Sequence, residues 1–317
     1  MFVATTSLTI LVACDRSVPS TMAGVVPSGQ PGPVLDLPLE ADGFQLLHET
    51  ERDWAIARGT VVWAREIGLN TRPVGEVMVT LATTFVGAPY APGTLEVPGP
   101  EALVINLRTF DCVTLVEHVL VLARLTVSQD AGLLDDEEAF REEYRRELTD
   151  ARYRGGMLSG YLSRLHYFSE WIRDAEAKGL VRAMSYSLGG VEDSRPIRFM
   201  SEHPESYRQL SEDFEVLEGI RRMEEGVTAE PRFYIPEDRI PDRAAGIQDG
   251  DIIAAVSTLD GLDVAHTGIA LWQEGELHLL HAPLVGDSVE VSELPLWERI
   301  RGFSSQMGIM VARPLQP

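Results

Sequence analysis

The sequence predicts an α+β fold. Apolar residues recur at helical spacings of three and four through the first two thirds of the chain, whereas short strand-like runs fill the last third. The two kinds of element do not alternate along the chain, as they would in βαβ units. Helices first and strands afterwards are typical of an α+β protein.

Five helical segments are expected in the first two thirds of the chain. They cover residues 44–67, 74–85, a stretch that begins near Asp111, 135–148 and 161–172. The second segment ends at Gly87-Ala88-Pro89, a cluster of residues that break helices. The fourth is strongly acidic, and we expect a solvated face there rather than a binding site.

Five strands are expected in the last third. They cover residues 251–256, 267–272, 277–281, 288–291 and 308–312. The sequence shows no internal repeat, and no segment is expected to cross a membrane as a helix.

The N-terminal segment 1–14 resembles a bacterial lipoprotein signal. Leu11-Val12-Ala13-Cys14 matches a lipobox, in which the chain is cut before the cysteine and a lipid is attached to it. The preceding residues contain no Lys or Arg, so the usual basic start of a signal is missing. Another export signal and an apolar start without any export role remain as alternatives. We expect an exported protein, placed in the periplasm or cell envelope as a lipoprotein through Cys14.

The rest of the chain is expected to divide into three parts. Residues 15–43 are rich in Pro, Gly and Ser and predict a flexible linker. An N-terminal helix would occupy residues 44–73, and the main domain residues 74–317.

The net charge of −22 at pH 7 excludes several classes of partner. Nucleic acids and anionic membrane surfaces are bound through local excesses of Lys and Arg. We therefore expect no nucleic-acid partner, and membrane attachment only through a lipid on Cys14.

Cys112 is the first candidate for chemistry. Asp111 is a preferred N-cap residue, which would place Cys112 in the first turn of a helix. Backbone N–H groups and the positive end of the helix dipole stabilise a thiolate there. If Cys14 carries a lipid, Cys112 has no cysteine left to pair with, and a free thiol in an exported chain indicates a function. The alternative is a small buried apolar residue.

Two histidines are candidates for a base and the residue that orients it. If Glu274-Gly275 forms a two-residue turn, Gln273 pairs with Glu276, and His266 and His281 fall on one face as diagonal neighbours. We expect Gly268, opposite His281, to leave room for their contact. His278 and His281 are three residues apart and therefore point to opposite faces of a strand, which is the wrong arrangement for one metal ion. We expect neither a metal nor a cofactor.

Around these residues the chain resembles the NlpC/P60 superfamily of papain-like cell-wall hydrolases. More narrowly, it is similar to the N-acetylmuramoyl-L-alanine amidase-like family once listed as DUF1460. The resemblance covers about residues 74–313, and its matching stretches are GAPYAPGTLE (87–96), NLRTFDCVTLVEH (106–118), ARYRGGMLSGYLSRLHYFSEWI (151–172), FMSEHPESY (199–207), GDII (250–253), GLDVAHTGIAL (261–271) and LLHAP (279–283). The most specific of them is RLHYFSEW. The resemblance implies a papain-like core of N-terminal helices packed on an antiparallel sheet, with a helical insertion.

The resemblance also implies roles for individual residues. Cys112 matches the nucleophile, His266 the general base and His281 the third, orienting residue. Tyr90 matches a tyrosine that helps to hold the oxyanion, and Asp111 matches the residue before the nucleophile. Candidate substrate contacts, each with packing or pairing within the protein as its alternative, are Arg152, Arg154, Arg164, His166, Tyr167 and Trp171.

The implied reaction is cleavage of the amide between N-acetylmuramic acid and L-alanine in peptidoglycan fragments (muropeptides), by a monomer. Two alternatives remain open. One is an endopeptidase of the same fold that cuts between D-Glu and the diamino acid of the stem peptide. The other is a lipid-anchored muropeptide-binding protein without turnover.

Overall fold

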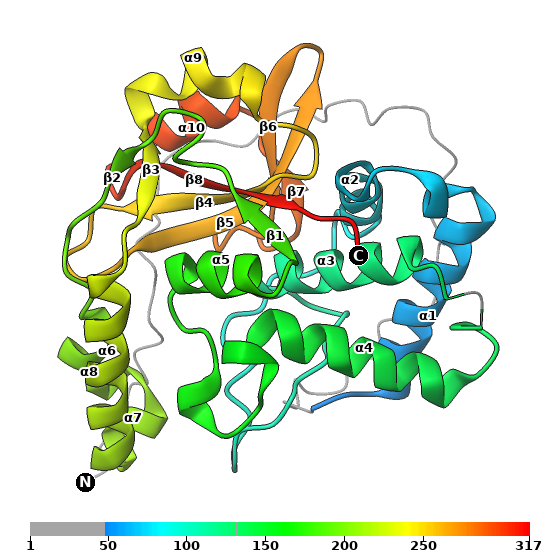
Figure 1. The fold of residues 1–317 in the computed structure, drawn as a ribbon, viewed down its shortest axis with the longest axis horizontal. Coiled ribbons are helices and arrows are strands. Elements are labelled where there is room, and N and C mark those ends of the chain that lie inside the picture. Colours follow the sequence, from blue (N-terminus) through cyan, green and yellow to red (C-terminus); the bar gives the residue numbers. More distant parts are fainter. Residues whose placement is uncertain (1–47, 131) are drawn as a thin grey trace, which may run out of the picture.

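The computed structural model describes residues 48–130 and 132–317. Helices and one antiparallel sheet occupy separate parts of the molecule, with most helices below and beside the sheet and two short helices above it (Figure 1). This arrangement confirms the predicted α+β class. The proposed signal 1–14, the linker 15–43 and Cys14 lie outside the described residues.

Three helices form the first layer beside the sheet. They are α1 (Glu51–Glu66), α2 (Val74–Thr84) and α3 (Cys112–Val127). Helix α3 is buried along almost its whole length because α1, α2, α4 and the sheet surround it. The predicted helix near Asp111 is therefore the central helix of the protein.

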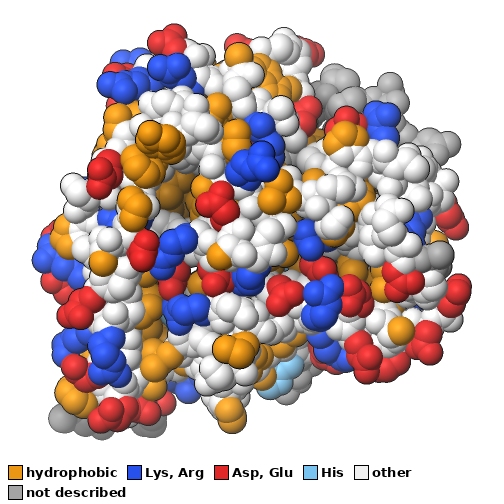
Figure 2. Space-filling view, in the orientation of Figure 1, with side chains coloured by type: hydrophobic (Ala, Val, Ile, Leu, Met, Phe, Trp, Pro, Cys, Tyr) orange, Lys and Arg blue, Asp and Glu red, His pale blue; other side chains and the backbone are white. Residues whose placement is uncertain are grey.

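The next helices are α4 (Glu137–Arg152) and α5 (Phe168–Ala177). The outer side of α4 carries acidic side chains interspersed with arginines (Figure 2), as expected for a solvated face. The prediction of one helix over 161–172 is wrong in its first half. Tyr161–Ser163 form a single 3₁₀ turn, and the next four residues are not helical before α5 begins. Arg164 and Tyr153 form an isolated antiparallel bridge, which takes this segment out of helical geometry.

A separate helical group follows, and it was not predicted. It contains α6 (Phe199–Glu202), α7 (Arg208–Glu212) and α8 (Phe214–Ala229). These helices lie together at one side of the molecule (Figure 1) and share a small apolar core with Tyr161 and Tyr167.

The sheet has eight strands. They are β1 (Val181–Ala183), β2 (Val191–Glu192), β3 (Phe233–Pro236), β4 (Ile252–Ser257), β5 (Val264–Gln273), β6 (Glu276–His281), β7 (Glu290–Val291) and β8 (Gln306–Pro314). Their order is β2-β3-β8-β4-β5-β6-β7, with β1 also paired to β8, and every pairing is antiparallel. All five predicted strands are present, whereas the short strands β1, β2 and β3 were not predicted.

Both faces of the sheet are covered, and the alternation of side chains along β4 shows how. Ile252, Ala254 and Val256 pack into the large core made with α1 to α5. Ile253 and Ala255 pack on the other face against α9 (Ile240–Arg243) and α10 (Leu296–Gly302). Because β4 is buried on both faces, it appears in the sequence as an uninterrupted apolar run.

The hairpin of β5 and β6 has the predicted register. Gln273 pairs with Glu276, and Glu274 and Gly275 both have positive φ angles (50° and 87°), as a two-residue type I′ turn requires. Ile269 pairs with Leu280, so that residue 268 lies opposite residue 281. The sheet therefore brings His266 and His281 to one face.

Among residues 48–130 and 132–317, no helix combines the length and the apolar character that crossing a bilayer would need.

Candidate active site

Cys112 is the first residue of α3, and Asp111 caps that helix. The Asp111 carboxylate accepts hydrogen bonds from the backbone N–H groups of Val113 (3.0 Å) and Thr114 (2.8 Å). In return, the Thr114 hydroxyl accepts the N–H of Asp111 at 2.9 Å, which completes a capping box. The Cys112 side chain is in no disulfide and is partly exposed. The thiol is therefore held at a fixed helix start and remains accessible.

This cap changes one expectation. Two of the first-turn N–H groups that were expected to stabilise a thiolate are occupied by the Asp111 carboxylate. The carboxylate also brings a negative charge close to residue 112. The helix start can therefore offer a developing anion fewer N–H groups than its position alone suggests.

Strand β5 is joined directly to the start of α3. The Thr267 hydroxyl donates a hydrogen bond of 2.7 Å to the carbonyl oxygen of Cys112. Thr267 is almost fully buried and directly follows His266. The contact holds the strand that carries His266 against the turn that carries Cys112.

His266 and His281 form the predicted pair. Nε2 of His266 and Nδ1 of His281 are 2.9 Å apart, and the two rings lie edge to face with centroids separated by 4.9 Å. A bulge lies beside the pair, since Ala255 pairs with His266 whereas Val256 pairs with Val264. Such bulges are frequent next to active sites because they redirect a side chain.

Both imidazoles are kept neutral by their surroundings. Burial lowers the pKa of His266 well below its usual value, and the positive charge of Arg299 adds to the effect. Burial also lowers the pKa of His281 well below its usual value, and a proton on His266 or the positive charge of Arg299 lowers it further. A neutral His266 is in the protonation state that a general base requires.

Glu290 lies behind His281. The two residues are direct cross-strand partners in β6 and β7, and Nε2 of His281 is 3.8 Å from Oε1 of Glu290. His281 is 1% exposed, and its Nε2 has no hydrogen-bond partner among the described residues. Burial raises the pKa of the Glu290 carboxyl, and Arg299 acts in the opposite direction.

The segment with Tyr90 joins the loop before Cys112 to the loop that leads to Glu290. Phe110, two residues before Cys112, exchanges backbone hydrogen bonds with Pro89 and Ala91 on either side of Tyr90. The N–H of Tyr90 itself donates to the carbonyl of Asp287 at 2.8 Å. Tyr90 is thus placed beside the Cys112 turn, and it packs on the main core.

Arg152 lies inside the protein, where it does not meet substrate. It is 1% exposed, and its guanidinium donates to Glu117 of α3 at 2.7 Å and to the carbonyl of Val104 at 2.5 Å. We therefore no longer assign Arg152 to substrate binding. It holds the loop before Cys112 against α3.

The other predicted arginines are also paired within the protein. Arg154 binds Glu170 through two hydrogen bonds of 2.7 and 3.0 Å, with its side chain 37% exposed. Arg164 is buried, pairs with Glu96 at 2.6 Å and lies over the Tyr161 ring. Pairing within the protein, the alternative weighed for such residues, describes both.

The aromatic residues of the insertion mainly fill space. Trp171 is fully buried and stacks on Phe168. Tyr167 is buried and donates to Glu224 at 2.7 Å. His166 packs against the Tyr161 ring, with its Nε2 2.9 Å from the Tyr161 carbonyl. The packing alternative therefore fits Tyr167 and Trp171, and we do not assign them to substrate.

Sequence reasoning missed three residues that organise the site: Asp263, Thr267 and Glu290. The buried Asp263 accepts the N–H of Ser169 at 2.8 Å and so ties the start of α5 to the start of β5. The predicted hairpin register gave a signal for Thr267, which is adjacent to His266 in the chain. No sequence signal pointed to Glu290, because the loop between β6 and β7 does not indicate which residue pairs with His281.

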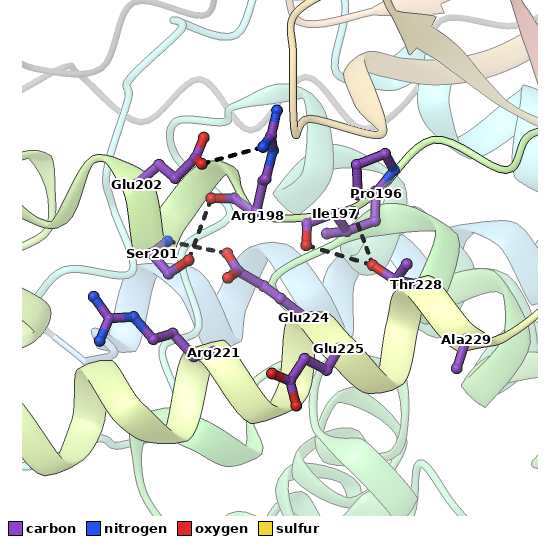
Figure 3. Close-up of a pocket in the computed structure, with 10 residues that line it drawn as sticks. All are labelled: Pro196, Ile197, Arg198, Ser201, Glu202, Arg221, Glu224, Glu225, Thr228 and Ala229. Carbon is purple, nitrogen blue, oxygen red and sulfur yellow. Dashed lines mark hydrogen bonds and ion pairs between the residues drawn. The ribbon is translucent and has the colours of Figure 1, made fainter.

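A hollow of about 590 Å³ opens between α6 and α8 (Figure 3). None of the predicted site residues lines it; its walls are made by Pro196, Ile197, Arg198, Ser201, Glu202, Arg221, Glu224, Glu225, Thr228 and Ala229. In the part of the chain that the structure describes, no group of three or more His, Cys, Asp or Glu side chains is arranged to hold a metal ion. His278 instead places its Nδ1 2.9 Å from the carbonyl oxygen of Ser292.

Comparisons with known proteins identify the family of this chain. Residues 80–307 match the model of the AmiA-like family, described as N-acetylmuramoyl-L-alanine amidase-like. A crystal structure of an N-acetylmuramoyl-L-alanine amidase from Bacteroides uniformis is 34% identical, with a TM-score of 0.70, over 77% of this chain and 99% of that one. A Bacteroides fragilis protein provisionally named a xylanase is 36% identical, with a TM-score of 0.68, over 73% of this chain and 98% of that one.

A Legionella pneumophila protein of the DUF1460 family shares the fold at 20% identity, with a TM-score of 0.59, over 84% of this chain and 96% of that one. Curated proteins gave no match. The family match covers most of the chain and includes Tyr90, Cys112, His266, His281 and Glu290. The chain therefore belongs to the N-acetylmuramoyl-L-alanine amidase-like family.

Proposed function

We propose that this protein is a cysteine amidase of the NlpC/P60 type, with a papain-like core, that cuts the bond between N-acetylmuramic acid and L-alanine in muropeptides. The observation that carries the proposal is the placement of a partly exposed Cys112 at the capped start of α3, hydrogen-bonded through its carbonyl to the residue next to His266. The family match and the Bacteroides uniformis amidase support the choice of bond.

The pairing of the histidines decides which nitrogen acts on the thiol. Nε2 of His266 is engaged by His281, so Nδ1 is the atom proposed to face Cys112. In the first step the Cys112 thiol gives its proton to Nδ1, and sulfur attacks the carbonyl carbon of the amide. His281 holds the ring so that Nδ1 keeps this direction.

The tetrahedral intermediate carries a negative oxygen. We assign the Cys112 backbone N–H and the Tyr90 hydroxyl to this oxyanion, because Asp111 occupies the next two N–H groups. The C–N bond then breaks, and His266 gives its proton to the amino group of L-alanine. The muramoyl lactyl group is left as a thioester on Cys112.

Water completes the cycle. His266 takes a proton from a water molecule, whose oxygen attacks the thioester carbonyl. The C–S bond breaks, the carboxylic acid of the sugar leaves, and the proton returns to sulfur. A glycoside hydrolase would instead need two carboxylates that flank the scissile bond. A thiol, two imidazoles and Glu290 do not supply that pair, so the xylanase name of one relative is not carried over.

The test is mass spectrometry of purified muropeptides incubated with wild type and with Cys112→Ala. The proposal expects wild type to release free peptides that begin with L-alanine, and the variant to release none. Sugar-L-Ala-D-Glu as the product would identify the endopeptidase instead. If wild type leaves every muropeptide intact and the Cys112 thiol resists alkylation, a binding protein without turnover is the better account.

We also propose export with a lipid on Cys14, and action as a monomer. The lipobox-like Leu11-Val12-Ala13-Cys14 supports the first point. Expression in a bacterial host followed by membrane fractionation tests it, since Cys14→Ala should move the protein out of the membrane fraction. Light scattering of the soluble chain tests the second point.

A further inference from the structure

Glu290 stands at the end of a line of polar groups that runs from His266 through His281. His266 and His281 are joined through Nε2 and Nδ1 at 2.9 Å, and Nε2 of His281 then faces the Glu290 carboxylate at 3.8 Å. The backbone fixes this line, because His281 and Glu290 are paired across β6 and β7. The Glu290 side chain is 44% exposed, and a hydrogen bond to His281 requires this distance to shorten to about 3 Å.

The tautomers in this line depend on one another. A neutral imidazole has one N–H and one bare nitrogen. If His266 is to accept a proton at Nδ1, its own proton must sit on Nε2, and that N–H must donate to a bare Nδ1 of His281. The proton of His281 is then on Nε2, which is the atom that faces Glu290.

The opposite arrangement would disable the base. If His281 carried its proton on Nδ1, it would donate to Nε2 of His266, and His266 would hold its proton on Nδ1. A base that already carries a proton there cannot take one from Cys112. The hydrogen bond between the histidines alone permits both arrangements, so something else must choose between them.

We propose that Glu290 is a positioning residue of the amidase: its carboxylate accepts the Nε2–H of His281 and thereby keeps Nδ1 of His266 bare for Cys112. This inference rests on the proposed cysteine amidase function. It explains why a fully buried Nε2 of His281, with no other hydrogen-bond partner among the described residues, is aimed at a carboxylate. Arg299 also lies close enough to act on the charge of Glu290 and on both imidazoles, and Glu293 acts on Glu290 from its own loop.

Nitrogen-15 NMR of the whole chain, labelled at histidine, reads the tautomers directly. At neutral pH, wild type should show both His266 and His281 protonated at Nε2. Glu290→Ala should reduce this form and make Nδ1–H signals appear, whereas Glu290→Gln should keep it, because the amide oxygen still accepts. Glu293→Ala is the matched control: it removes an exposed carboxylate whose charge raises the pKa of Glu290, so Glu290 should stay ionised and the Nε2–H form should persist.

Kinetics on muropeptides supply the second readout. Glu290→Ala should lower kcat by roughly 10- to 100-fold, by analogy with outer partners of metal-bound histidines, while KM stays near the wild-type value. Glu290→Gln and Glu293→Ala should remain close to wild type. Thermal unfolding of each variant shows whether a loss of rate comes from a loss of folding.

Two results would overturn the inference. The first is that the histidine tautomers of Glu290→Ala are the same as those of wild type. The second is that Glu290→Ala and Glu290→Gln lose kcat equally while both still show the Nε2–H signals. Failure of the amidase proposal looks different. In that case wild type cuts no muropeptide, while the NMR comparison of Glu290→Ala with Glu290→Gln still decides whether Glu290 sets the histidine tautomers.

Discussion

The hydroxyl of Thr267 donates to the carbonyl oxygen of Cys112 at 2.7 Å, across 155 positions of sequence. Cys112 begins the buried helix α3, and Thr267 lies near the start of strand β5. Between residue 112 and residue 267 the chain forms α4 to α9 and the strands β1 to β4. One side-chain contact therefore links the helix with the thiol to the strand with the histidine.

Replacing Thr267 by Val should damage activity more than folding. The substitution keeps the shape of the side chain but leaves the Cys112 carbonyl without this donor, which should cost about 1–3 kcal/mol of stability. Because the hydrogen bond sets the position of the helix start against β5, kcat on muropeptides should fall, whereas Thr267→Ser should retain most of it. Denaturant unfolding and steady-state kinetics measure the two effects, and equal kinetics for Val and Ser would contradict the role given to this contact.

Gly268 is expected to tolerate no side chain. A Cβ there would lie 2.8 Å from Leu279 side-chain atoms and 2.8 Å from the Leu280 carbonyl oxygen. The close approach of β6 requires the glycine, rather than the contact between the histidines that the sequence suggested. Gly268→Ala should push β5 and β6 apart, lower the unfolding free energy by about 1–3 kcal/mol and disturb the histidine pair.

Gly226 in α8 provides the matched control for this prediction. A Cβ added at Gly226 meets nothing within 4 Å. Gly226→Ala should therefore stabilise the protein, by roughly 0.5–1 kcal/mol, through the better helix propensity of alanine. Denaturant unfolding of both variants should give shifts of opposite sign, and a stable Gly268→Ala would sink the explanation.

Arg152 should be essential for stability. Arg152→Met would leave the buried Glu117 without its partner, and such a loss typically costs about 3–5 kcal/mol. Adding Glu117→Leu should recover much of the stability, because the unpaired carboxylate is then removed. Arg146→Ala breaks exposed pairs with Glu143 and Asp150, while the buried Glu147 keeps Arg124 as a partner, and it should cost no more than about 1 kcal/mol. If Arg152→Met lowered the unfolding free energy by no more than Arg146→Ala does, this account would be wrong.

Acid should destabilise the protein through its buried histidines. The folded-state pKa values of His118, His266 and His281 are all lowered, so below the ordinary value of 6.5 the unfolded chain binds protons that the folded chain does not. Stability that is present above pH 6.5 is therefore lost as the pH falls, by about 1 kcal/mol per histidine between pH 6.5 and about pH 5.5.

Glu117 and Asp263 act in the other direction, because burial raises their pKa values. The comparison of wild type with His281→Gln separates the two effects, since the carboxyls are common to both proteins. The unfolding free energy of His281→Gln, followed by denaturant titration from about pH 7.5 downward, should fall less steeply below pH 6.5 than that of wild type. Parallel curves would mean that His281 is charged in the folded state.

The parts of the fold that depend on local patterns could be predicted from the sequence. Helix α3 was predicted from its Asp111 cap and its apolar spacing, and the β5–β6 hairpin from Glu274-Gly275. The register of that hairpin was enough to place His266 beside His281. Each of these rests on residues that are close together in the sequence.

What could not be predicted depends on contacts between distant residues. Arg152 and Arg154 looked similar in the sequence, yet one turns inward to Glu117 and the other outward to Glu170. The difference arises because α4 packs against α3, which carries Glu117. Glu290 could not be predicted either, because the residues between His281 and Glu290 give no local sign that the two strands pair.

The position of β8 determines when the sheet of this protein can be completed. This strand follows all the others in the chain but lies between β3 and β4, and β1 also pairs with it. A chain interrupted before residue 306 would have a gap in its sheet between β3 and β4, and β4 would lack its neighbour on one side. During synthesis, Cys112 thus emerges long before β8, and the sheet that carries His266 is completed only after residue 314 has appeared.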